Sequence, residues 1–147
     1  MKATLHLRCI ELAAEKVNSL EKEMESMRQA VQAESKSTAG DKHETGRAMI
    51  HLEQEKLHAQ LAEAQNLLAE LEQINPEQTL LTVQKGALVQ TEHIQFYIAV
   101  GLGKINLDGQ DIFVVSSQSP IGKQMLSKRA GGSFNMNGTE YIITSVE

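Results

Sequence analysis

The chain lacks tryptophan and has only three phenylalanines, two tyrosines, two prolines and one cysteine among its 147 residues. A single cysteine excludes an internal disulfide, and we interpret Cys9 as a partly covered small side chain. The sequence contains neither a signal peptide nor an apolar run long enough to span a bilayer. We therefore expect a cytoplasmic protein with no membrane association.

A strongly basic region is also missing. Residues 1–75 carry nine Lys or Arg against thirteen Asp or Glu, and residues 76–147 carry five against six. A domain that binds nucleic acid directly neutralises many phosphates and needs an excess of positive charge. Any contact with nucleic acid, DNA included, is therefore expected to be indirect.

Apolar residues recur at alternating spacings of three and four in two stretches of the first half, as a coiled coil requires. One stretch contains Ile10, Ala13, Val17, Leu20, Met24, Met27 and Val31; the other contains Ile50, Leu57, Leu61, Ala64, Leu68 and Leu71, with Gln54 as its polar member. Paired residue numbers add to 81 throughout, as in Leu20 with Leu61, and constant sums indicate antiparallel packing. Glu34 with Arg47 would be the next pair, and Gly40 is expected in the turn. The pattern predicts helices near residues 5–38 and 41–74.

The second half changes character at Asn75-Pro76, because proline disfavours helical geometry in the residue before it. We expect strands at Thr79–Val83, Ala87–Thr91, Ile94–Val100, Ile105–Leu107, Ile112–Ser116 and Tyr141–Val146. Ser119 as N-cap and Pro120 at the first helical position predict a short helix that Gly131-Gly132 would end. Gly101-Leu102-Gly103 is interpreted as a hairpin turn. The chain is thus predicted to be α+β, with a hairpin at 1–75 and a small, mostly antiparallel sheet at 76–147.

Two carboxylates occupy a special position at the hairpin tip, in the segment Asp41-Lys42-His43-Glu44. An aspartate followed three residues later by a glutamate is typical of a helix capping box. Alternatively, Asp41 and Glu44 could help to hold Mg²⁺, which often binds one or two carboxylates together with water and phosphate. Two ligands are too few for a catalytic centre, so this reading requires a host that supplies the others. His43 is interpreted as an exposed residue of the helix start.

These features together resemble the Gre family of bacterial transcript-cleavage factors over nearly the whole chain. The resemblance rests on Gly40-Asp41-x-x-Glu44 at the tip of a long hairpin and on Ser119-Pro120-Ile121-Gly122. It is extended by Leu126, Lys128, a glycine pair and the segment from Gly138 to Ile143.

The resemblance implies a monomeric factor that binds RNA polymerase and is not itself an enzyme. Its hairpin would enter the secondary channel, where Asp41 and Glu44 would help to position Mg²⁺ and water for the polymerase's own cleavage of backtracked RNA. No cofactor would be bound by the isolated chain. The carboxyl-terminal domain would have an FKBP-like fold and contact a polymerase coiled coil through Ser119, Pro120 and Ile121.

The tip departs from the family pattern, since Thr45-Gly46-Arg47-Ala48 stands where relatives usually have asparagine and a Glu-Tyr pair. An inhibitor or competitor at the same channel is therefore an alternative to a cleavage factor. An FKBP-like fold also suggests a peptidyl-prolyl isomerase, although the few aromatic residues argue against a proline pocket. A plain coiled-coil adaptor is the remaining alternative, in which the tip acids only cap a helix.

Overall fold

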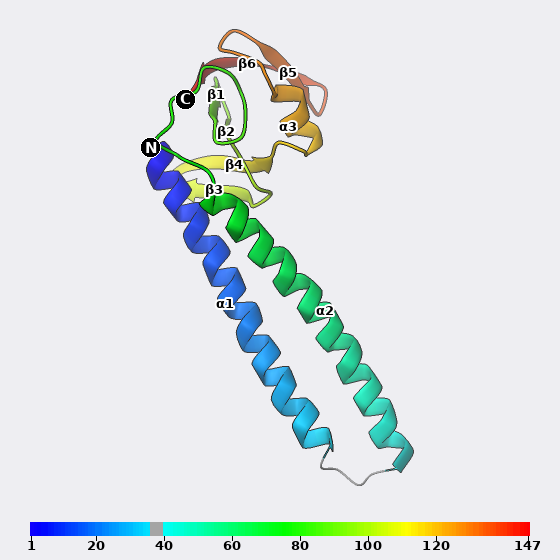
Figure 1. Cartoon of the computed structure of the whole chain (residues 1–147). Coiled ribbons are helices and arrows are strands. Elements are labelled where there is room, and N and C mark those ends of the chain that lie inside the picture. Colours follow the sequence, from blue (N-terminus) through cyan, green and yellow to red (C-terminus); the bar gives the residue numbers. More distant parts are fainter. Residues whose placement is uncertain (36–39) are drawn as a thin grey trace. The chain divides into compact units, whose positions relative to one another are not determined.

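The computed structural model describes the backbone of residues 1–35 and 40–147, and the side chains of residues 1–33 and 46–147. Two long helices come first (Figure 1), α1 (Lys2–Ser35) and α2 (Gly40–Glu72). They are followed by β1 (Leu88–Thr91), β2 (Gln95–Ala99), β3 (Gly103–Leu107), β4 (Gln110–Ser116), α3 (Pro120–Met125), β5 (Ser133–Met136) and β6 (Thr139–Val146). The predicted fold class is confirmed: a long helix pair precedes a mainly antiparallel sheet with one short helix.

The described residues form two compact units. One consists of Glu11–Leu68, and the other combines Met1–Ile10 with Ala69–Glu147. The boundary expected between residues 75 and 76 is placed where the secondary structure changes. These two units are instead defined by which residues pack against one another. The first turns of α1 and the last residues of α2 therefore belong to the unit that contains the sheet.

The hairpin unit is held by an apolar core between α1 and α2. Its members are Val17, Leu20, Leu57 and Ala64, with Met24, Met27, Leu61 and Leu68 packed against them. Near the carboxyl-terminal end of α1, Val31 borders one small hollow together with Arg47, Ile50 and His51. Val31 beside Ile50 agrees with the register in which paired numbers add to 81. A slip of seven residues would instead place Val31 near position 43 or 57.

The sheet has the strand order β3-β4-β2-β1-β6-β5. Every neighbouring pair is antiparallel except β2 with β4, which run parallel from Gln95 opposite Ile112 to Ala99 opposite Ser116. Two-residue turns with positive φ angles join β3 to β4 at Asp108-Gly109 and β5 to β6 at Asn137-Gly138. This backbone geometry is typical of tight hairpins, which is why these dipeptides are such clear turn signals.

Alternate residues of β2 reach opposite faces of the sheet, as the two-residue period of a strand requires. Phe96 and Ile98 belong to the core beneath α3, where Met125 and Phe134 also lie. Between them, Tyr97 points to the other face and meets His6 of α1. Both faces of this central strand are therefore covered within the same unit.

Three local predictions for the sheet unit are wrong. Thr79–Val83 is not a strand, although Leu80 and Val83 are buried in the core. Gly101–Gly103 is not a hairpin turn, because β4 lies between the two strands that it connects. The short helix ends at Met125, well before Gly131, since Leu126 leaves helical geometry and Ser127 has a φ of 68°.

One strand, β5, was not predicted. Ser133–Met136 contains a single strong strand former, Phe134, so its composition gave little signal. The turn at Asn137-Gly138 was the available clue, because a hairpin turn needs a strand on each side.

Candidate functional site

Asp41 lies in the first turn of α2, which begins at Gly40, and Glu44 lies at the start of the second turn. Residues three apart lie on the same side of a helix, and carboxylates in the first turn are favoured by the helix dipole. Asp41 is thus inside the helix and not at the N-cap position that a capping box would give it. The side chains of both acids, and that of Glu34, lie outside the described residues, as does the turn between the helices.

Metal ligands do not gather elsewhere in the described part of the chain. Among the side chains of residues 1–33 and 46–147, no group of three or more His, Cys, Asp or Glu could hold a metal ion. The carboxylates of Asp41 and Glu44, which are expected to contribute to a shared Mg²⁺, lie outside these side chains. Their role stays a prediction.

The start of α3 has the local structure that its sequence predicts. Ser119 is the N-cap, and its hydroxyl accepts a hydrogen bond from the Gly122 amide at 3.0 Å. The same hydroxyl donates to the Ser116 carbonyl at 2.6 Å. Pro120 occupies the first position of the helix, where its missing N–H costs no helical hydrogen bond. These bonds fix the backbone on which Pro120 and Ile121 are presented.

Gly122 allows α3 to approach the end of β4. A Cβ atom built on this glycine would lie 2.1 Å from the Ser116 carbonyl oxygen. No larger residue can occupy that position without moving the backbone, because the nearest atom is not part of a flexible side chain. Glycine therefore sets the position of α3 relative to the end of β4.

The three predicted docking residues are exposed to different degrees. Pro120 is exposed, Ser119 is partly covered and Ile121 is half-buried against the core beneath α3. Pro120 is thus available to a partner, while Ile121 links this surface to the core. Binding of a partner by this segment remains a prediction.

A buried polar contact that sequence reasoning missed joins α1 to the sheet. His6 Nδ1 lies 2.8 Å from the Tyr97 hydroxyl, and the ring also makes a hydrogen bond to the Leu71 backbone. Burial lowers the pKa of His6 and raises that of Tyr97. Nothing in the sequence pairs residues 91 positions apart; the only signal was a histidine among apolar residues near the start of α1.

Cys9 lies close to this contact and is fully buried. Burial raises the pKa of its thiol to about 11, so the thiol stays protonated at neutral pH. Because the thiolate is the reactive form, Cys9 is a packing residue and not a nucleophile. The sequence predicts a partly covered side chain, whereas Cys9 is completely covered because it lies among the packed residues of the sheet unit.

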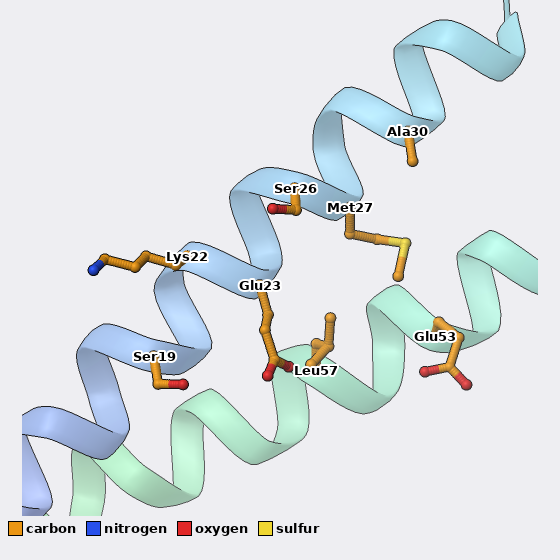
Figure 2. Close-up of a pocket in the computed structure, with 8 residues that line it drawn as sticks. All are labelled: Ser19, Lys22, Glu23, Ser26, Met27, Ala30, Glu53 and Leu57. Atoms are coloured by element: carbon orange, nitrogen blue, oxygen red, sulfur yellow. The ribbon is translucent and has the colours of Figure 1, made fainter.

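A hollow of about 540 Å³ lies on one flank of the hairpin unit. Figure 2 shows its lining residues, which are Ser19, Lys22, Glu23, Ser26, Met27, Ala30, Glu53 and Leu57. In this view Met27 extends toward α2, while the Lys22 side chain points away from it. Small side chains on α1 leave the space unfilled. The charged groups on its border are solvent-exposed, so it has the character of a packing gap.

The aromatic residues are used for packing. Phe96, Tyr97 and Phe134 are buried, and Phe113 and Tyr141 pack against the same core as Phe96 and Phe134. Aromatic rings are also absent from the lining of two hollows on the sheet unit. One is bordered by residues 1–3, 76–81 and 146–147, and the other by Gln73, Ile74, Asn75, Gln78 and Lys85. An aromatic-walled proline pocket therefore gains no support from these hollows.

Comparisons with known proteins give only distant similarity. No family model matches the chain, and no curated protein matches it. Among solved structures, it is similar to the GreA factor homolog 1 (Gfh1) protein of Thermus thermophilus, with a TM-score of 0.40 and 14% identity over 94% of each chain. A structure of the transcription factor Gfh1 gives a TM-score of 0.40 and 13% identity, covering 94% of this chain and 92% of the other. Within the described residues, no helix is both long and apolar enough to span a membrane.

Proposed function

We propose that this protein is an accessory factor of bacterial RNA polymerase. Its hairpin enters the secondary channel and stimulates the polymerase's own cleavage of backtracked RNA. The observation that carries the proposal is the position of Gly40-Asp41-x-x-Glu44 at the start of the second helix in a two-helix hairpin. A motif at that point lies at the end of the hairpin, where it can reach a site inside another protein.

The chemistry proposed for the tip is limited to what two carboxylates can do. Asp41 and Glu44 lend oxygen ligands to a Mg²⁺ ion and orient water, while polymerase residues and RNA phosphates supply the remaining ligands. In two-metal hydrolysis the ions stabilise both the attacking and the leaving oxygen. The chain then requires no cofactor of its own.

A second candidate function is inhibition at the same channel. It is favoured by the sequence after Glu44, where Arg47 stands three residues further along α2 and the usual aromatic residue is absent. An arginine at this spacing can pair with a carboxylate on the same side of a helix. Such pairing would compete with the metal for Glu44.

One assay separates these functions. A backtracked elongation complex of the cognate polymerase, with its RNA labelled at the 5′ end, is incubated in Mg²⁺ with and without the protein. Faster shortening of the RNA supports the cleavage factor. Binding without shortening, together with slower extension on nucleotide addition, supports the inhibitor. Absence of binding to polymerase contradicts both functions.

A further inference from the structure

Acidic residues are absent from a long stretch around α3. Residues 112–139 contain no Asp or Glu, although the chain as a whole has a net charge of −5. The same stretch contains Lys123, Lys128 and Arg129. Lys123 and Arg129 are exposed, and Lys128 is half-buried. We call these three residues, together with the adjoining exposed Pro120, the α3 basic face.

The backbone beneath this face is well anchored. The Val83 amide donates to the Lys128 carbonyl at 2.8 Å, and the Ser127 amide donates to the Val83 carbonyl at 2.8 Å. The ammonium group of Lys128 donates to the Ser133 carbonyl, which ties the turn to the start of β5. The basic groups are therefore presented by a fixed helix and turn.

A second tie connects α3 to the same strand. The Asn135 amide donates to Oε1 of Gln124 at 3.1 Å, and Figure 1 shows α3 beside β5. Gln124 is the neighbour of Lys123 in α3. The helix that carries Lys123 and the turn that carries Arg129 are thus held by one strand.

Acidic side chains are scarce in the segments bonded to this face. Residues 81–85 and 132–135 contain none, and residues 81–85 add a further exposed cation, Lys85. On β6 the acid is Glu140, which lies opposite Asn135. In the described part of the chain neither Lys123 nor Arg129 has an ion-pair partner. The positive charge of the face is therefore not neutralised internally.

We infer that the α3 basic face binds an acidic surface of a protein partner. This inference rests on the proposed function and gives the docking surface of RNA polymerase a chemical character. Pro120 supplies an apolar contact, and the surrounding cations supply complementary charge and orientation. Nucleic acid fits less well, because binding to it requires a broad excess of cations and residues 76–147 carry one more acid than base.

The test compares the affinity of the cognate core polymerase for the full-length protein and for a variant with Lys123→Glu and Arg129→Glu. We expect the double variant to bind about tenfold more weakly at low salt, and its affinity to fall less steeply as salt is raised. Lys104→Glu is the control for a single charge reversal away from the face, because Lys104 is exposed on β3, 3.9 Å from an Asp111 carboxylate oxygen, at the opposite edge of the sheet from β5. Its affinity should stay close to wild type, and circular dichroism should show all variants folded.

Each result decides the inference. Tight binding of the wild type with unchanged affinity of the double variant overturns this inference and leaves the proposed function standing. No binding of the wild type overturns both. A double variant that loses affinity for free single-stranded RNA while keeping its affinity for polymerase would assign the face to nucleic acid and contradict the inference.

Discussion

The Nδ1 atom of His6 lies 2.8 Å from the hydroxyl oxygen of Tyr97, with the two rings arranged edge to face at a centroid distance of 6.0 Å. The ring also bonds to the backbone of Leu71, so one side chain connects the first turns of α1, the end of α2 and strand β2. With one ring nitrogen donating to the Leu71 carbonyl, the other is left to accept the Tyr97 hydroxyl proton. The neutral imidazole satisfies both partners.

The lowered pKa of His6 predicts that stability falls in mild acid. The unfolded chain binds a proton on this histidine below its ordinary pKa of 6.5, while the folded chain resists it. The contribution of His6 is therefore complete above that value and is lost as the pH falls below it. Urea unfolding at pH 8 and pH 5 should show a larger loss for wild type than for His6→Gln. Equal losses would contradict this assignment.

Replacing Tyr97 with phenylalanine tests the same contact without a change in charge. The variant leaves a buried imidazole nitrogen without its donor, which costs about 1–3 kcal/mol in the free energy of unfolding. Urea unfolding at pH 8 measures this cost. Tyr141→Phe is the control, because Tyr141 is only partly covered and stacks on Phe134 through its ring. It should change stability by less than about 0.5 kcal/mol.

Gly122→Ala should destabilise the sheet unit although alanine is the better helix former. Alanine gains about 1 kcal/mol of helix propensity over glycine. Its Cβ would lie 2.1 Å from the Ser116 carbonyl oxygen, and overpacking against fixed atoms costs about 1–3 kcal/mol. Gly101→Ala is the matched control, since nothing lies within 4 Å of its Cβ position and its φ is not positive. A melting temperature for Gly122→Ala equal to that of the control would refute the clash.

The hairpin core provides a fourth stability test. Leu20 is 2% exposed and belongs to the apolar core between α1 and α2. Leu20→Ala should therefore lower the free energy of unfolding by about 2–5 kcal/mol, followed through the helical signal in urea. Leu52 lies on α2 with 66% exposure, and Leu52→Ala should cost less than about 0.5 kcal/mol. Similar effects of the two substitutions would contradict the packing described for the hairpin.

The sequence predicted the parts of the fold that are determined locally. The spacing of residues such as Leu20 and Leu61 predicted the helix pair, and Ser119-Pro120 predicted the start of α3. Features that depend on distant partners were not predictable. Val83 is buried without belonging to a strand, because its amide and carbonyl bond to residues 127 and 128. The link between His6 and Tyr97 likewise requires the complete fold.

The residues of the candidate site also differ in whether their role depends on local structure or on a distant partner. The cap made by Ser119 is a local structure, and it is confirmed. The roles of Pro120 and Ile121 depend on a partner surface, and those of Asp41 and Glu44 depend on a metal held largely by another protein. No pattern within one chain determines such ligands. For Pro120 and Ile121 the resemblance to Gre factors supplied the hypothesis, and for Asp41 and Glu44 it favoured metal binding over the capping alternative that the residues left open.

Replacing each tip carboxylate with a neutral amide tests the metal-binding hypothesis directly. Asp41→Asn and Glu44→Gln remove one carboxylate each while keeping residues of similar size at the start of α2. If the carboxylates position Mg²⁺ and water, each variant should lose most of the stimulation of RNA cleavage, because amides are weaker ligands for this cation. Both should still bind polymerase and compete with wild type, so that excess variant inhibits cleavage by the wild-type protein. Gln54→Glu is the control for position. Gln54 is a partly covered residue of α2 away from the tip, so a carboxylate added there should not restore cleavage to either variant. Full cleavage stimulation by both Asp41→Asn and Glu44→Gln would show that the acids serve only the helix start, and the proposed metal chemistry would then be wrong.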